Sequence, residues 1–220
     1  MAEINAESME QTHIEHKGDG GKFAETLKAD GAGKEFAQSL KESDKDIPDT
    51  GEISDYPSTY KERIEQTPKG DDGRGEWTGE RGESKYVPTD EEMKEILAEY
   101  GVDGIEYRGG IPDFSEIAEA TVEIENMSEN RHATPDGKPG NFEQADQKCA
   151  EQWSKEGKDG KTDWTARDVA NWRRENGYCW HERNDMKTCD LVTNKHNYFG
   201  HLGGVKECKI AKAKENRFDE

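Results

Sequence analysis

Residues 177–204 decide the fold of this chain, and they read GYCWHERNDMKTCDLVTNKHNYFGHLGG. Residues 178–182 are extended and rich in aromatic side chains, residues 183–185 are turn formers, and residues 186–192 form a second apolar-leaning run. This order predicts a β-hairpin. The residues after it, which end at a Gly-Gly pair, predict a loop and one short helix.

Three of the six histidines lie in this stretch, as His181, His196 and His201. A two-stranded ribbon against one helix is too small to form a core, so we expect a divalent cation to hold the pieces together. Neutral imidazole binds such cations. A cation with open positions can bind a phosphodiester oxygen and stabilise the leaving alkoxide, and a neighbouring histidine can activate the attacking water.

The composition predicts that only part of the chain folds. Of its 220 residues, 30% are hydrophobic and 37% are charged, which is too few apolar side chains for a core over the whole length. We expect residues 1–73, rich in glycine and charge, to be an acidic, mostly disordered segment. Residues 74–215 are then the folded domain, with the hairpin and helix at about 177–205.

The charge is unevenly distributed, and this matters for partners. A net charge of −19 argues at first sight against binding nucleic acid. Residues 1–150, however, carry 17 Lys and Arg against 37 Asp and Glu, whereas residues 151–215 carry 13 against 11. A nucleic-acid function therefore stays open for the C-terminal part of the chain.

Upstream of the hairpin, the sequence predicts further helices and short strands. One helix follows Thr89 as its cap, with its stop at Gly101, and two more follow caps at Asn141 and Thr165. Two short extended pieces surround the turn at 108–110, and ATVEIENM predicts another strand. No run of about 18 apolar residues predicts a membrane segment, and the first residues lack the features of a classical signal peptide.

At this point the residues resemble a known family. Trp180-His181-Glu182, followed by MKTCDLV, His196 and HLGG, resembles the WHH-type branch of the HNH nuclease superfamily, found as toxin domains in bacterial polymorphic toxin systems. GEWTGERGES, GIEYRGGIPDFS, FEQAD and DGKTDWTARDVANWRRENGY resemble its upstream part, so the resemblance covers about residues 75–209. It implies an α+β fold with a ββα-metal hairpin-and-helix core, and metal-dependent hydrolysis of DNA phosphodiester bonds.

The resemblance also implies roles for individual residues. His196 and His201 become ligands of one divalent ion, which is Mg, Mn, Zn or Ni. His181 is either the general base, with Glu182 assisting as a ligand or orienting group, or a third metal ligand. Residues i and i+5 lie about 140° apart on a regular helix, so His196 and His201 cannot both bind one ion from an undistorted helix. Apart from the resemblance, the sequence offers a set of local cations that is expected to form a rim for the phosphate backbone. Its members are Arg183, Lys187, Lys195, Lys206, Lys209, Lys212 and Lys214, and the first three are predicted to bind the substrate.

The function that follows is that of a DNA endonuclease used as an antibacterial effector. We expect DNA and a cognate immunity protein as partners, a cytoplasmic location before export, delivery without a classical signal peptide, and action in the cytoplasm of the target cell. Two alternatives stay open. The acidic charge would suit an immunity-like or DNA-mimic inhibitor without catalysis, and the same fold could act on RNA instead.

Overall fold

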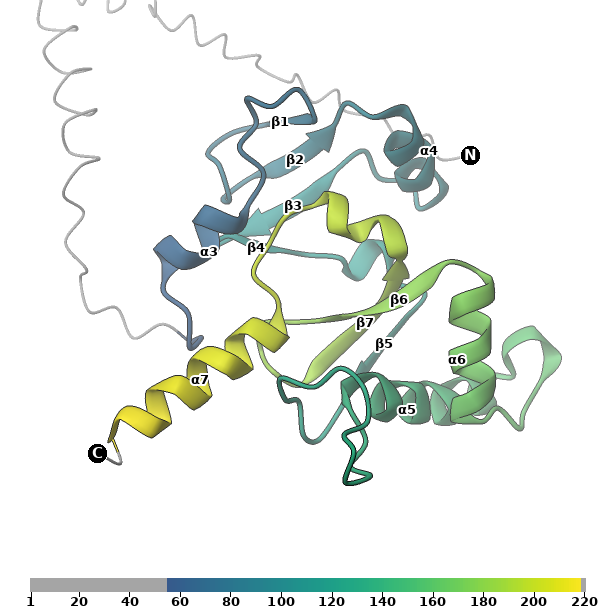
Figure 1. Cartoon of the computed structure of the whole chain (residues 1–220). Helices are drawn as coiled ribbons and strands as arrows, with labels where there is room; N and C mark the ends of the chain where they lie inside the picture. The colour runs from purple at the N-terminus through teal and green to yellow at the C-terminus, as the bar shows by residue number, and fades with distance from the viewer. Residues whose placement is uncertain (1–54, 219–220) are drawn as a thin grey trace, which may run out of the picture. The chain divides into compact units, whose positions relative to one another are not determined.

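The structure, a computed structural model, describes residues 55–218 (Figure 1). Every described residue belongs to one compact unit, which extends from Ile53 to Glu220. The segment predicted to be disordered covers residues 1–73, and residues 1–54 of it lie outside the described residues. For residues 55–73 that prediction is wrong, since they belong to the folded unit and carry helix α3 (Tyr60–Gln66).

Helix α3 is held by polar contacts rather than by an apolar face. Thr59 and Glu62 form a capping box at its start. Arg63 is 7% exposed, and its Nε donates to the Gly109 carbonyl over 2.7 Å. The backbone N–H of Ser58 donates to the Glu207 carboxylate, also over 2.7 Å. Such long-range polar contacts leave no periodic pattern in the sequence, which is why composition placed this segment outside the folded domain.

The first sheet is four-stranded and antiparallel, with strands in the order β1-β2-β3-β4. The turn between its last two strands is made by Gly109 and Gly110, whose φ angles are +58° and +75°, and this confirms the predicted turn. One helix, α4, connects the second strand to the third (Figure 1). The elements are β1 (Gly75–Trp77), β2 (Lys85–Pro88), α4 (Glu91–Glu99), β3 (Ile105–Arg108) and β4 (Ile111–Pro112).

The second sheet contains the predicted hairpin and one further strand. Strand β6 (Tyr178–Glu182) pairs with β7 (Thr188–Thr193), and β5 (Ala120–Glu123) pairs with the other edge of β7, all antiparallel. Helices α5 (Asn141–Glu156) and α6 (Ala166–Glu175) lie together against this sheet (Figure 1). Their apolar side chains form a core with those of the strands, including Ala145, Cys149, Trp153, Val169, Trp180 and Leu191.

One of the three predicted helix caps is confirmed, and the other two are wrong by one residue. Thr165 caps α6 with the predicted Asp168 capping box. Helix α4 is capped by Asp90 and not by Thr89, whose hydroxyl instead donates to the Gly73 carbonyl over 2.6 Å. Gly140 is the cap of α5, and Asn141 is its first residue. Neighbouring residues of capping type cannot be ranked without knowing their tertiary partners.

The segment after β7 differs from the predicted loop and single short helix. It forms a 3-10 helix, η3 (Asn194–Tyr198), an irregular connection, and then α7 (Gly204–Phe218). His196 lies in η3 and His201 in the connection, so the two histidines do not share a helix. The remaining 3-10 turns are η1 (Ser115–Ile117) and η2 (Lys158–Gly160). Residues 55–218 thus form a mixed fold of helices and two small antiparallel sheets, and none of the helices in this range is long and apolar enough to cross a membrane.

Candidate functional site

The structure brings the three predicted histidines together. The ring centroid of His181 lies 5.9 Å from that of His196 and 4.9 Å from that of His201, and the last two are 6.2 Å apart. His181 projects from β6, while the other two come from the segment that returns after β7. Residues separated by up to twenty positions therefore meet in one cluster.

Phe114 packs against all three imidazoles, which the sequence did not indicate. Its ring centroid lies 4.7 Å from that of His181, 5.8 Å from His196 and 5.6 Å from His201, in edge-on arrangements. Phe114 follows the first sheet directly and is 1% exposed. It lies within the GIPDFS motif used for the resemblance, but nothing in the sequence shows that this phenylalanine faces the histidines.

Backbone hydrogen bonds fix the protonation of two of these rings. The Nδ1–H of His196 donates to the Thr193 carbonyl over 3.0 Å, and that of His201 donates to the Phe199 carbonyl over 2.7 Å. Because a carbonyl only accepts, the unprotonated nitrogen of each ring is Nε2. Burial, aided by the nearby His181, lowers the pKa of His196 to about 4 and that of His201 to about 3. Both rings are therefore neutral at pH 7, with a lone pair on Nε2.

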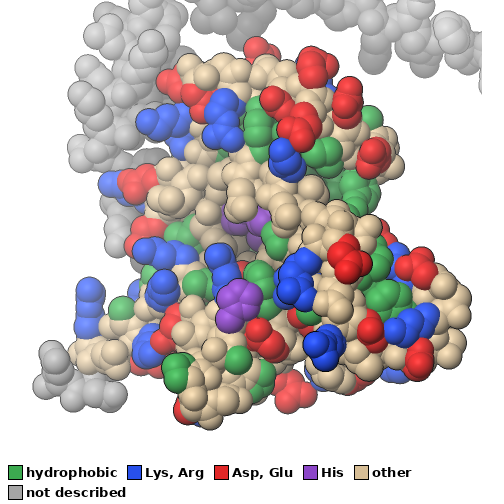
Figure 2. All heavy atoms as spheres, turned by 45° about the vertical axis from the view of Figure 1, so that its right-hand side comes forward, with side chains coloured by type: hydrophobic (Ala, Val, Ile, Leu, Met, Phe, Trp, Pro, Cys, Tyr) green, Lys and Arg blue, Asp and Glu red, His purple; other side chains and the backbone are tan. Residues whose placement is uncertain are grey.

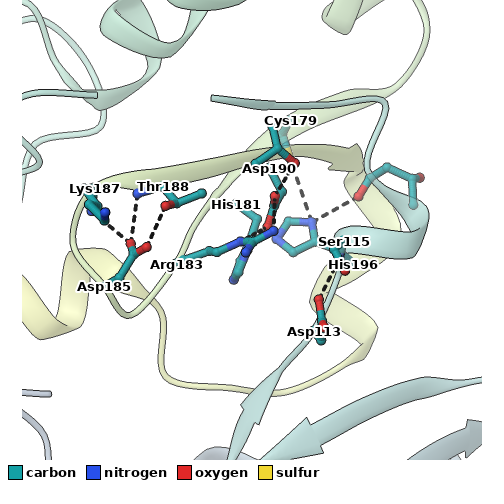
Figure 3. A network of polar contacts seen from close by, with 12 residues as sticks. Asp113, Ser115, Cys179, His181, Arg183, Asp185, Lys187, Thr188, Asp190 and His196 are labelled. Atoms are coloured by element: carbon teal, nitrogen blue, oxygen red, sulfur yellow. Dashed lines mark hydrogen bonds and ion pairs between the residues drawn. The ribbon is translucent and has the colours of Figure 1, made fainter. Parts of the chain in front are cut away.

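His181 faces a buried carboxylate across the hairpin, as Figure 3 shows. It is paired in register with Asp190, and its Nδ1 lies 3.6 Å from Asp190 Oδ2. Among the residues described, neither ring nitrogen of His181 has a hydrogen-bond partner, although the side chain is only 3% exposed. An unpartnered buried imidazole is costly unless a ligand or water completes it.

Asp190 is itself tightly held. Arg183 donates to its carboxylate from Nε over 2.6 Å and from Nη2 over 2.7 Å, and the Thr121 hydroxyl donates over 2.8 Å. Burial acts to raise the pKa of Asp190, but its contacts with His181, Arg183 and Thr121 outweigh burial and hold the pKa at about 2. The sequence analysis missed Asp190, because the register that places it opposite His181 depends on the length of the hairpin turn.

The donor set fits a divalent cation, although the side chains are not arranged around one. As they lie, no group of three or more His, Cys, Asp or Glu side chains between residues 55 and 218 could hold a metal ion. Two imidazoles on one ion, with metal–nitrogen distances of about 2.0–2.1 Å, have centroids roughly 5 Å apart. The spacing of 4.9 Å between His181 and His201 is close to this value, and the other two spacings, 5.9 and 6.2 Å, are wider. The unpartnered nitrogens of His181 and the two free Nε2 atoms supply suitable donors, provided that the rings turn toward one point.

Glu182 lies beside His181 but is engaged elsewhere. Its carboxylate accepts from Arg131 Nε over 3.2 Å and from Asn141 Nδ2 over 3.2 Å, and the residue is 3% exposed. It thereby anchors Arg131, whose side chain is 59% exposed and whose terminal nitrogens make no hydrogen bond within residues 55–218. Arg131 lies in a loop rich in proline and glycine, where sequence periodicity gives no signal.

Two open cavities meet at this cluster. One, of about 430 Å³, is lined by all three histidines together with Arg131, Phe142 and Cys179 among others. The second, of about 510 Å³, lies between α3 and α7 and shares Arg131, His201 and Gly203 with the first. Figure 2 shows histidine side chains in and beside a hollow, with Lys and Arg side chains gathered around it. The cluster is therefore accessible to a ligand.

Of the cations predicted to contact phosphates, Lys206 and Lys209 line a cavity, whereas Arg183, Lys187 and Lys195 are paired with carboxylates. Arg183 contacts Asp190 as described, Lys187 Nζ lies 3.3 Å from a Glu123 oxygen, and Lys195 Nζ lies 2.9 Å from a Glu92 oxygen. Among the residues described, the cations that line the cavities are Arg131, Lys206 and Lys209.

Residues 104–203 match the family model described as the DNase/tRNase domain of colicin-like bacteriocin. This match supports a nuclease toxin domain. The matched region includes the three histidines, Phe114, Arg131 and Asp190, so the whole cluster lies inside it. It also favours a nuclease over the inhibitor that the acidic charge left open. No curated protein and no solved structure matches the chain.

Proposed function

We propose that this domain is a metal-dependent endonuclease of the WHH-type HNH branch that hydrolyses DNA phosphodiester bonds. The observation that carries the proposal is the convergence of His181, His196 and His201 beside two cavities with a cationic border. The segment that provides them matches the colicin nuclease model. An inhibitor would have no use for three imidazoles that share one cluster.

His196 and His201 would hold the divalent cation through their Nε2 atoms, because their Nδ1 atoms are engaged with backbone carbonyls. The ion is Mg, Mn, Zn or Ni, and when bound it supplies charge stabilisation to the phosphate and to the leaving oxygen. A hydrogen bond from the other ring nitrogen to a backbone carbonyl commonly fixes the tautomer and direction of a metal-binding histidine.

His181 is assigned the role of general base. Asp190 lies on the Nδ1 side of its ring, so it favours the tautomer with hydrogen on Nδ1 and leaves Nε2 free to take a proton from water. Arg131 is assigned to the phosphate, since its anchored guanidinium presents free terminal nitrogens where the cavities meet. In this assignment Glu182 positions Arg131 through their hydrogen bond and serves neither as a metal ligand nor as a base.

The biological role we propose is that of an antibacterial toxin, because the matching family model is named for bacteriocins. Such a toxin would be delivered without a classical signal peptide and would act in the cytoplasm of its target. The cell that makes it would need a cognate immunity protein as a partner. RNA is the second candidate substrate, and it is favoured only by the tRNase part of the printed family description.

Incubation of the full chain with plasmid DNA and with single-stranded circular DNA tests this proposal. We expect cleavage in at least one of Mg, Mn, Ni or Zn, no cleavage with chelator, and loss of cleavage in His181→Ala with an unchanged circular dichroism spectrum. A matched RNA substrate in the same assay separates the two candidate substrates. If a protein that is shown to be folded leaves both forms of DNA intact under every metal, the proposal is refuted.

A further inference from the structure

The cavity between α3 and α7 has two walls of opposite charge. Lys206 and Lys209 of α7 line one side and are exposed, and neither pairs with a carboxylate among the described residues. Glu62 and Glu65 of α3 line the other side and are also exposed. The volume of about 510 Å³ lies within the range of roughly 300–1,000 Å³ that is typical of small-molecule sites, so the cavity can hold a nucleotide.

The position of this cavity links it to the histidine cluster. It shares Arg131 and His201 with the cavity that contains the three histidines. A strand whose scissile phosphate lies at the histidines would therefore continue into the space between the two helices. Its phosphates would contact the lysines of α7, because neutralisation of phosphates dominates nucleic-acid affinity.

The acidic wall, formed by Glu62 and Glu65, can accept hydrogen bonds from bases and repels a second phosphate backbone. Carboxylates accept hydrogen bonds from the exocyclic amino groups of bases, and Gln66 beside them can both donate and accept. The phosphates of an opposite strand would meet like charges there. Helix α3 is a fixed wall, since Arg81 donates to the carbonyls of Ile64 and Thr67 at its end, over 2.9 and 2.8 Å.

We propose that this cavity binds an unpaired DNA strand next to the scissile phosphate, with its backbone on α7 and its bases on α3, and that Glu62 and Glu65 exclude the second strand of a duplex. This inference rests on the proposed function, because it assumes that the histidines act on a phosphodiester. The preferred substrates would then be unpaired strands, such as those at gaps, frayed ends or loops.

Binding measured without cleavage tests the inference separately from the activity. The full chain carrying His181→Ala is titrated into a fluorescein-labelled 20-nucleotide single strand and into the matching duplex, and anisotropy gives both affinities. The double variant Glu62→Gln, Glu65→Gln removes the acidic wall, and glutamine at 62 keeps the capping box. The matched control is Glu95→Gln, Glu99→Gln on α4, which removes the same charge from a helix that does not line the cavity.

We expect the parent protein to bind the single strand more tightly than the duplex. The α3 variant should raise duplex affinity at least about threefold more than single-strand affinity, because like-charge repulsion is relieved only for the second strand, while the control should change both affinities equally. Equal gains for both ligands in the α3 variant, the same pattern in the control, or no binding to either ligand would overturn the inference. Failure of the proposed function would instead appear in the cleavage assay, as both the plasmid and the single-stranded circular DNA left intact.

Discussion

Replacement of Asp190 by asparagine should reduce cleavage through His181 while the fold is kept. Asp190 is fully buried, receives three hydrogen bonds from Arg183 and Thr121, and lies 3.6 Å from the Nδ1 of His181. Asparagine has nearly the same shape but no charge. It can present its amide nitrogen to the imidazole, which would favour the wrong tautomer for a base that must accept a proton on Nε2.

The cost in stability follows from the pKa of Asp190, which the folded protein lowers from 3.8 to about 2. A shift of one unit corresponds to about 1.4 kcal/mol, so the ionised carboxylate contributes about 2 kcal/mol to the free energy of unfolding. Because the folded pKa is the lower one, this contribution is complete above pH 3.8 and is lost as the pH falls toward 2. The stability difference between the wild type and Asp190→Asn should therefore shrink over that range.

The effect on catalysis should be a fall of about 10- to 100-fold in kcat with little change in KM, as is common when an outer-shell partner is lost. Steady-state cleavage of a labelled oligonucleotide measures both constants, and urea denaturation measures stability. The matched control is Asp146→Asn. Asp146 is 3% exposed, accepts from Arg173 over 2.9 and 3.1 Å and from Trp180 over 2.8 Å, and does not contact the histidines.

Both variants should lose similar stability, but only Asp190→Asn should lose kcat. Equal kcat values for the two variants would show that Asp190 is a structural residue and would refute the orienting role. A large rise in KM without a fall in kcat would likewise place Asp190 in substrate binding instead of positioning of the base.

Substitutions at three further positions test the framework around the cluster. Phe114→Ala should lower the free energy of unfolding by about 3–5 kcal/mol, which urea denaturation measures. Phe114→Leu should reduce the cleavage rate more than the stability, because the three imidazoles lose the aromatic ring that packs against them. An unchanged cleavage rate in Phe114→Leu would contradict this prediction. Asn184→Ala removes the hydrogen bonds to the Leu202 carbonyl and to Glu207, 2.8 and 2.7 Å long, and should cost about 1–3 kcal/mol, measured by thermal unfolding. Gly110→Ala should cost about 1–2 kcal/mol in the same assay, since φ is +75° and the new Cβ would lie 2.9 Å from the Cβ of Arg63.

Sequence reasoning succeeded where structure is decided locally. The hairpin at 178–193, the Thr165 cap and the glycine turn at 109–110 follow from alternation, capping chemistry and backbone freedom within a few residues. The clustering of the three histidines also followed, because the hairpin and the returning segment bring them to one end of the sheet.

Tertiary partners could not be predicted in the same way. Arg131 comes from an irregular loop and is identified only by its contact with the buried Glu182. Helix α3 depends on bonds from Ser58 and Arg63 to residues that lie up to 149 positions away. Cations were chosen from the sequence because they are near the histidines in the chain. Of these, Arg183, Lys187 and Lys195 are paired in space with Asp190, Glu123 and Glu92.

The histidine cluster requires both sheets and not the hairpin and helix alone. One core group contains Tyr86, Tyr107 and Phe114 from the region of the first sheet, and also Val192 and Phe199 from β7 and the returning segment. Phe114 contacts both Phe199 and the three imidazoles. The packing that a two-stranded ribbon cannot supply is therefore provided by the first sheet. Because hydrophobic contacts already hold the pieces together, the cation that we propose is needed for chemistry and not for assembly. Its removal should therefore abolish cleavage while leaving the domain folded.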